Sequence, residues 1–238
     1  MEKPDLREKG GERGGQRQYS DRRLFMQLLA FGGCRITPGL VRELTSWEME
    51  GVLYEDVNDP QGVALVTWSA DPAFFATELR QRLQRSAFSE LRFKPDFTML
   101  GRTYAIGHEP DLSDWLLDKP RRSATAPESP WAVWYPLRRA GAFQQLGAEE
   151  QSAILREHGT IGHSFGAAGY AQDIRLACFG LDRNDNDFVI GLVGADLHGL
   201  SACVQAMRKT RQTAGFIANM GPFFVGRAVW QRLLSERL

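Results

Sequence analysis

Four histidines, His108, His158, His163 and His198, are the residues with which this chain could most readily do metal or acid–base chemistry. His158 is the last residue of a predicted helix over 149–158, and it lies four residues after Ile154, on the apolar side. Gly159 can end that helix. The negative end of the helix dipole would raise the basicity of the ring and favour a nearby cation, so this imidazole could hold a metal ion. The ordinary alternative, which physics alone favours, is a C-terminal histidine that binds the last carbonyls of the helix.

The segment GHSFG, over residues 162–166, also fits the GxSxG pattern of a hydrolase nucleophile elbow. That elbow needs a strand before it and a helix after it, whereas here a helix precedes and a strand follows. The downstream chain offers only His198 as a base, in the first turn of a predicted helix beside Asp196. The sequence therefore argues against a hydrolase. His108, at the start of a long connection, has the pattern of a loop residue.

Tyr135 lies in the predicted strand WAVWYPLRR, where alternation puts it on one face with Val133 and Leu137. An aromatic residue in a strand is usually part of a core. Arg138 and Arg139 at the end of the strand could bind anionic groups.

Composition excludes several classes of protein. The chain has 238 residues, 43% of them hydrophobic, and 29 basic side chains balance 29 acidic ones, so no overall charge favours nucleic acid. No stretch resembles a signal peptide or a membrane span, and we therefore expect a cytoplasmic protein. Cysteine spacing gives no zinc motif and predicts reduced, buried thiols at Cys34, Cys178 and Cys203.

Element order predicts an α+β protein. Residues 1–19 are mostly polar or glycine, which predicts a disordered tail. Over 20–105 the pattern alternates as strand, helix, two strands, helix and strand, the split ferredoxin-like unit. Its predicted strands are 24–31, 52–57, 63–68 and 97–104, and its helices begin at Thr37-Pro38 and Asp71-Pro72. Residues 106–130, with four prolines and a Lys119-Arg121-Arg122 cluster, form a predicted linker or loop.

Residues 131–238 repeat the first half. Predicted strands at 131–137, 173–180, 187–193 and 223–227 alternate with a helix at 149–158 and one that Asp196 caps. The two halves correspond at a constant offset of 125 residues, which relates Ala70-Asp71 to Ala195-Asp196 and Gly101-Arg102 to Gly226-Arg227. We therefore expect tandem ferredoxin-like repeats, the dimeric α/β barrel architecture, with antiparallel sheets that pack face to face and helices on the outer faces.

Several motifs together resemble the chlorite dismutase family, and within it the coproheme decarboxylases. They are YPLRR (135–139), REHGTIGHSF (156–165), FGLDRNDNDFVIGLVGADL (179–197) and MRKT…GPFFVGR (207–227). The resemblance implies that His158 is the proximal ligand of the iron of haem b or coproheme. It implies that Tyr135 forms the radical that attacks a propionate. It implies that Arg139 and Arg208 bind propionates, with hydrogen peroxide as oxidant, in a homopentamer.

The chain also departs from the family pattern. Chlorite-degrading members carry a distal arginine on the strand after the proximal helix. Here Gln172, Asp173 and Arg175 compete for that position, and the best register selects Asp173. Those members also place a carboxylate against the proximal ring, whereas the corresponding stretch here, KTRQTAG (209–215), has no acid. The distal histidine of actinobacterial decarboxylases has no clear counterpart.

Three hypotheses follow. The first is peroxide-dependent oxidative decarboxylation of coproheme to haem b. The second is chlorite dismutation or weak peroxidase activity at bound haem b. The third is a non-catalytic porphyrin carrier or sensor. In each case the partner is an iron porphyrin, and neither nucleic acid nor a membrane span is expected.

Overall fold

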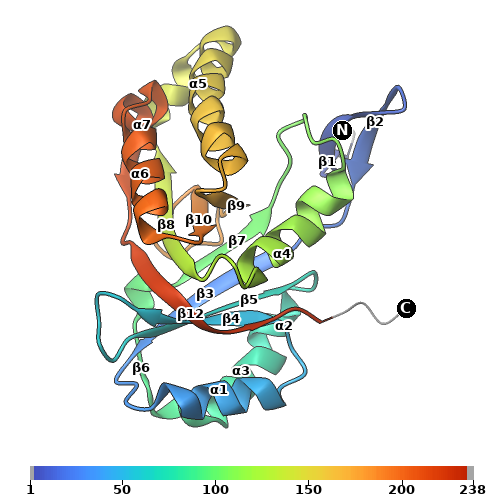
Figure 1. Ribbon diagram of the computed structural model, residues 1–238. Helices are drawn as coiled ribbons and strands as arrows, with labels where there is room; N and C mark the ends of the chain where they lie inside the picture. The colour runs from blue at the N-terminus through green and yellow to red at the C-terminus, as the bar shows by residue number, and fades with distance from the viewer. Residues whose placement is uncertain (1–2, 235–238) are drawn as a thin grey trace.

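The computed structural model describes residues 3–234, and it forms an α+β barrel built from two similar halves (Figure 1). The strands of the first half are β3 (Phe25–Gly32), β4 (Gly51–Asp56), β5 (Val63–Ser69) and β7 (Met99–Thr103). Its helices are α1 (Thr37–Ser46), α2 (Ala73–Ala76) and α3 (Glu78–Gln84). Short pieces join them: η1 (Ala87–Glu90), β6 (Arg92–Phe93) and η2 (Pro95–Phe97). The predicted order of elements in this half is confirmed.

The second half repeats this order. Its strands are β8 (Trp131–Arg139), β9 (Gln172–Ala177), β10 (Phe188–Gly194), β11 (Ile217–Met220) and β12 (Phe224–Arg232). Its helices are η4 (Gly141–Gln145), α5 (Ala148–Ala167), α6 (Leu197–Arg208) and α7 (Arg211–Phe216). Asp196 caps α6 as predicted, since its Oδ1 accepts from the His198 N–H at 2.9 Å.

The two sheets do not pack face to face, which corrects the expectation above. They join edge to edge, because β12 pairs with β4 and β7 pairs with β9, all antiparallel. The strand order β10-β9-β7-β3-β5-β4-β12-β8 closes on itself through the β8–β10 pair, so eight strands form a ring. Closure leaves no free sheet edge within the ring.

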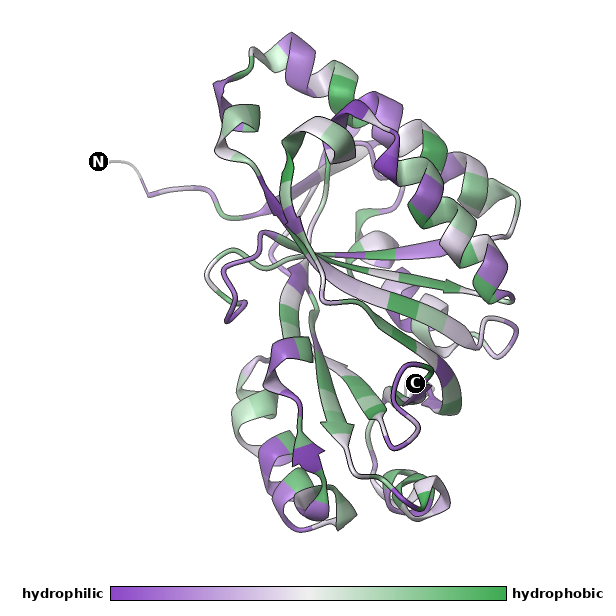
Figure 2. Ribbon diagram, turned by 90° about the vertical axis from the view of Figure 1, so that its left-hand side faces the viewer, coloured by the Kyte–Doolittle hydropathy of each residue, from purple (hydrophilic) through white to green (hydrophobic). Residues whose placement is uncertain are grey.

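Large apolar side chains from both halves fill the inside of this ring, among them Met26, Tyr54, Trp134 and Phe224. Two further cores lie outside it, one under α1 and α3 and one under α6. Hydrophobic residues concentrate along the strands, whereas the helices alternate between polar and apolar positions (Figure 2). Helices α1, α3 and α6 cover the barrel with their apolar faces.

The N-terminal segment is ordered over most of the predicted tail, which is a second correction; residues 1–2 lie outside the described part. Strands β1 (Glu8–Arg13) and β2 (Gln16–Ser20) form a hairpin. Gly14 and Gly15, with φ of 60° and 78°, make the two-residue turn that such a hairpin needs. The Gly11 N–H donates to the Glu109 carbonyl at 3.0 Å and docks the hairpin on the connecting segment.

Residues 106–130 are not a simple loop either, which is a third correction. They contain the π-helical turn η3 (Asp114–Asp118) and helix α4 (Lys119–Thr125). Leu116, Leu117 and Ala124 of this segment are buried against the barrel core. Glu50 anchors it, because its two carboxylate oxygens accept from Arg121 at 2.6 and 2.9 Å. No helix of the described part is long and apolar enough to span a membrane.

Candidate functional site

The candidate site lies on the outer face of the second half, and the register of three neighbouring strands builds its floor. Tyr135 of β8 is opposite Ile190 of β10, and Ile190 is opposite Arg175 of β9. Directly opposed residues share a face, so these side chains form one row across the sheet. Leu192 and Asp173 belong to the next row on the same face. Ile174, which alternates with Asp173 and Arg175, points into the barrel.

Helix α5 supplies His158, and this helix is longer than the sequence predicted. It continues through Gly159 to Ala167. The residue that ends it is Gly169, with φ of 74°; the Gly169 and Tyr170 N–H groups donate to the carbonyls of Gly166 and Phe165 at 3.0 Å each. His158 is therefore in the middle of a helix, and the expectation that it lies at the negative end of the helix dipole was wrong.

The His158 ring is half-buried, and its Nδ1 lies 3.2 Å from Thr210 Oγ1. Burial lowers the pKa of His158 below its usual value, and the nearby Arg175 and Arg139 guanidinium groups lower it further. The ring is therefore neutral at neutral pH, the form in which histidine binds metals.

Tyr135 is 5% exposed, and its ring stacks on Phe223 with 4.5 Å between centroids and 17° between planes. Burial raises the pKa of Tyr135 well above its usual value, so the phenol keeps its proton. Arg208 lies against the same stack, with Cζ 5.7 Å from the Phe223 centroid.

Arg139 lies between two aromatic rings at the end of β8. Its Cζ is 4.4 Å from the Phe143 centroid and 4.9 Å from the Phe188 centroid. Its Nε is buried and finds no hydrogen-bond partner within residues 3–234. Burial lowers the pKa of Arg139, so the site holds a cation at an energetic cost.

A second group of charges lies where β9 meets the connecting segment. Asp173 forms an ion pair with Arg175, with 2.8 Å between its Oδ2 and Arg175 Nε, and its other oxygen lies 3.8 Å from Lys119 Nζ. Both cations lie against Trp115, at 3.9 Å for Lys119 Nζ and 4.8 Å for Arg175 Cζ. The Trp115 indole N–H donates to the Tyr104 carbonyl at 3.1 Å. The connecting segment is thus one wall of the site.

The structure brings together five of the residues singled out from the sequence: His158, Tyr135, Arg139, Asp173 and Arg175. Arg208 is near them through Phe223. Gln172 is not among them, because it pairs with Val193 on the barrel-interior side and its amide donates to the Gly166 carbonyl at 3.3 Å.

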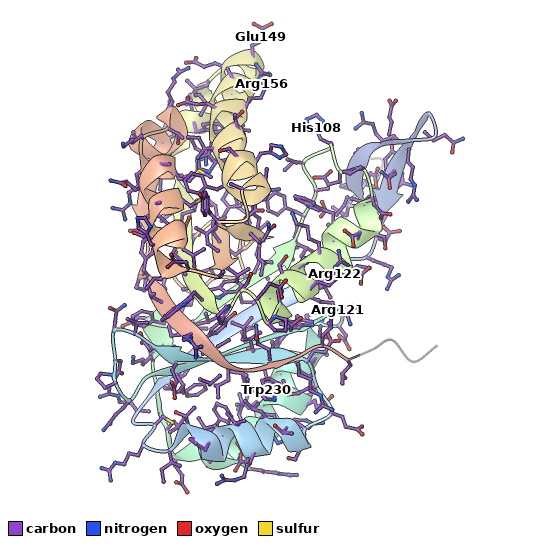
Figure 3. The ribbon with its side chains drawn as sticks, viewed as in Figure 1. His108, Arg121, Arg122, Glu149, Arg156 and Trp230 are labelled. Carbon is purple, nitrogen blue, oxygen red and sulfur yellow. The ribbon has the colours of Figure 1, made fainter. Side chains whose placement is uncertain are left out.

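The other histidines do not join the site. His108 is exposed at the tip of the loop after β7, across from α5 (Figure 3). His163 lies in α5, and the neighbouring Ser164 hydroxyl donates to the Ile161 carbonyl at 2.8 Å, so no nucleophile elbow forms. Among residues 3–234, no group of three or more histidine, cysteine, aspartate or glutamate side chains could hold a metal ion.

Sequence reasoning missed Thr210, Tyr104, Trp115 and Lys119 as members of this site. Thr210 could have been suspected, since it lies in the stretch 209–215 that corresponds to the partner of the proximal ring. The Lys119 cluster was visible as charge, but its partners on β9 are 54 residues away in the sequence and are set by the barrel closure.

Comparison with known proteins identifies the fold and the family. The family model for chlorite dismutase matches residues 74–229. A haem-binding protein from Thermus thermophilus superposes with a TM-score of 0.68 at 19% identity, covering 87% of this chain and 91% of that one. A putative chlorite dismutase gives a TM-score of 0.69 at 16% identity, with 88% and 96% covered. A mutant chlorite dismutase from Candidatus Nitrospira defluvii, solved with cyanide, gives 0.66 at 13%, with 88% and 92% covered.

At these identities the superpositions establish the shared fold. The family model spans well over half of the chain, including Tyr135, Arg139 and the helix that carries His158. This chain belongs to the chlorite dismutase family.

Proposed function

We propose that this chain binds an iron porphyrin through His158 and catalyses the peroxide-dependent oxidative decarboxylation of coproheme to haem b. The observation that carries the proposal is the grouping of one neutral imidazole, one buried tyrosine and a buried, unpaired Arg139 Nε on a single face.

The surfaces of the site suit a flat apolar ligand. Ile154 is the one buried residue among the twenty of α5, while Ile161 and Phe165 on that helix are half-buried. Ile190, in a strand between two others, is also half-buried. Apolar positions of a helix and of a central strand normally lose their contact with water, so a porphyrin between them would complete the packing.

The charges suit carboxylates. Arg139 and Arg208 would bind propionates by charge-assisted hydrogen bonds, and a propionate would satisfy the Arg139 Nε that is now buried without a partner among the described residues. The neutral ring of His158 would also suit the iron, which binds imidazole nitrogen.

When bound, the iron porphyrin would react with hydrogen peroxide and supply the oxidising power. Tyr135 would then give up an electron and its phenolic proton, and its radical would take a hydrogen atom from a propionate. Loss of carbon dioxide and a second electron would leave a vinyl group, so each propionate consumes one peroxide and one proton and yields two waters. The Phe223 stack would hold the Tyr135 ring in place, and burial would keep water from the radical.

The test is conversion of coproheme by the Tyr135→Phe variant. We expect coproheme to bind, as seen in the Soret band, and the mass loss of two carboxylates after peroxide to disappear. Tyr54→Phe is the matched control, because Tyr54 is equally buried but lies inside the barrel. Conversion by Tyr135→Phe at the parent rate would show the radical assignment to be wrong.

Chlorite dismutation is a second candidate, and Arg175 favours it. This guanidinium lies in the same row as Tyr135, where it could attract an anion. Asp173 neutralises it at 2.8 Å, which favours decarboxylation instead. Oxygen release from chlorite, measured with an electrode and abolished in Arg175→Ala, would support the second candidate.

Binding of haem with neither activity would support a carrier or sensor. The homopentamer remains a prediction, which light scattering would test.

A further inference from the structure

We propose that Thr210 is the positioning residue of His158. Its hydroxyl oxygen accepts a hydrogen bond from the Nδ1–H group, and this leaves the lone pair of Nε2 for the ligand. The inference depends on the proposed function only for what that ligand is. Thr210 Oγ1 lies 3.2 Å from His158 Nδ1, and Thr210 is 1% exposed, so little water competes for this contact.

The hydroxyl has a single proton, and its neighbours determine where that proton goes. Oγ1 lies 2.8 Å from the Met207 carbonyl oxygen, which can only accept, and 3.3 Å from Thr213 Oγ1, so we assign the proton to the closer Met207 carbonyl. The Thr213 backbone N–H donates to Oγ1 at 3.3 Å, because Thr210 caps α7. What Oγ1 offers to the ring is therefore a lone pair, and Nδ1 must be the donor.

This assignment fixes the tautomer of a neutral ring. A neutral imidazole carries one N–H, and when that N–H is on Nδ1 the other nitrogen, Nε2, carries a lone pair. Thr210 itself is held at the junction of α6 and α7, so two helices fix the position of the acceptor relative to α5.

The type of acceptor also sets the strength of the ligand. A carboxylate partner draws the Nδ1 proton toward itself and makes the ring a stronger donor to a metal, whereas a hydroxyl is neutral and accepts more weakly. We therefore infer that His158 is an ordinary neutral imidazole ligand, without imidazolate character.

The first test needs no porphyrin. In the metal-free protein labelled with ¹⁵N-histidine, above the pKa of His158, we expect Nδ1 to give the resonance of a protonated nitrogen and Nε2 that of a bare one. Thr210→Ser should keep this pattern, and Thr210→Val should shift the ring toward the Nε2–H tautomer. A parent ring already protonated on Nε2, or no change in Thr210→Val, would overturn the inference.

The second test uses the haem-loaded protein. Thr210→Asp should raise the frequency of the ferrous iron–histidine stretch and make the reduction potential more negative, while Thr210→Val should lower the frequency and weaken haem binding about 10-fold. Asp and Ser both keep the N-cap of α7, so a shift in Thr210→Asp cannot come from loss of the cap. Equal spectra for the parent and Thr210→Asp would contradict the inference.

The two tests separate this inference from the proposed function. If His158→Ala left the haem spectrum unchanged, the proposed axial ligand would be wrong. The tautomer measured in the metal-free protein would still decide the role of Thr210.

Discussion

At the scale of single residues, Arg139 is a charge whose burial is only partly compensated in the free protein. Its guanidinium is packed between the rings of Phe143 and Phe188, and its Nε lacks a partner within the described residues. A buried charge without full compensation destabilises a folded protein, and such groups tend to mark functional sites. Under the proposed function, a bound propionate would supply the partner that Arg139 Nε lacks among the described residues.

The variant Arg139→Met separates these two effects. It keeps much of the side-chain volume and removes the charge, so we expect thermal unfolding of the free protein at the same or a higher temperature. Affinity for coproheme should fall about 10-fold or more, the loss expected when one charge-assisted hydrogen bond is removed. A lower unfolding temperature with unchanged affinity would show that Arg139 has only a structural role.

The buried thiols give a prediction in pH. Burial raises the pKa of Cys178 to about 12 and that of Cys203 to about 11. Only the thiolate reacts, and at pH 8 about one Cys203 in a thousand is ionised, so alkylation of the native protein should be slow at both sites. Because the folded protein favours the protonated thiols, their contribution to the free energy of unfolding is fully present below the thiol pKa of the unfolded chain. It is lost as the pH rises through about 11 and 12. Mass spectrometry after iodoacetamide at pH 8, native against urea-unfolded, measures the difference; equal rates would contradict it.

At the scale of elements, the length of helix α5 is set by the glycine that ends it, which is Gly169 and not Gly159. Gly159 is helical and an added Cβ would meet nothing within 4 Å, whereas Gly169 has φ of 74°. Gly159→Ala should therefore stabilise the protein by about 0.5–1 kcal/mol, because alanine is the better helix former. Gly169→Ala should destabilise it by about 1 kcal/mol or more. Urea unfolding measures both changes. A loss of stability in Gly159→Ala would indicate that the helix ends at Gly159 and would contradict this assignment.

The elements show what the sequence could and could not predict. Strand and helix order followed from the hydrophobic pattern, and the face shared by Tyr135 and Val133 followed from strand alternation. The end of α5 was missed because glycine permits both a helical and a left-handed backbone, and only the closing hydrogen bonds to Gly166 and Phe165 decide between them. The hairpin at Gly14-Gly15 was missed for two reasons. Its polar composition resembles that of a disordered segment, and its docking partner Glu109 is distant in the sequence.

At the scale of the whole molecule, the offset of 125 residues between Gly101 and Gly226 has a structural cause. Each glycine lies in the last strand of its half, at the seam where that strand meets the other half. A Cβ on Gly101 would lie 2.7 Å from Leu176 Cβ, and one on Gly226 would lie 2.8 Å from both the Glu55 carbonyl oxygen and Tyr54 Cβ. The repeat thus preserves a glycine at each of the two seams, where an added Cβ would meet the other half of the barrel.

Closure of the barrel can therefore be tested at these glycines. Gly101→Ala and Gly226→Ala should each destabilise the protein by about 1–3 kcal/mol, the usual cost of overpacking, as measured by urea unfolding. Gly39→Ala is the matched control, because Gly39 lies in α1 with nothing within 4 Å of an added Cβ, and it should be neutral or stabilising. Since Leu176 lies one residue after Arg175, Gly101→Ala should also displace the floor of the site and weaken porphyrin binding. If both seam variants were as stable as Gly39→Ala, the two halves would not be held together by these close strand contacts.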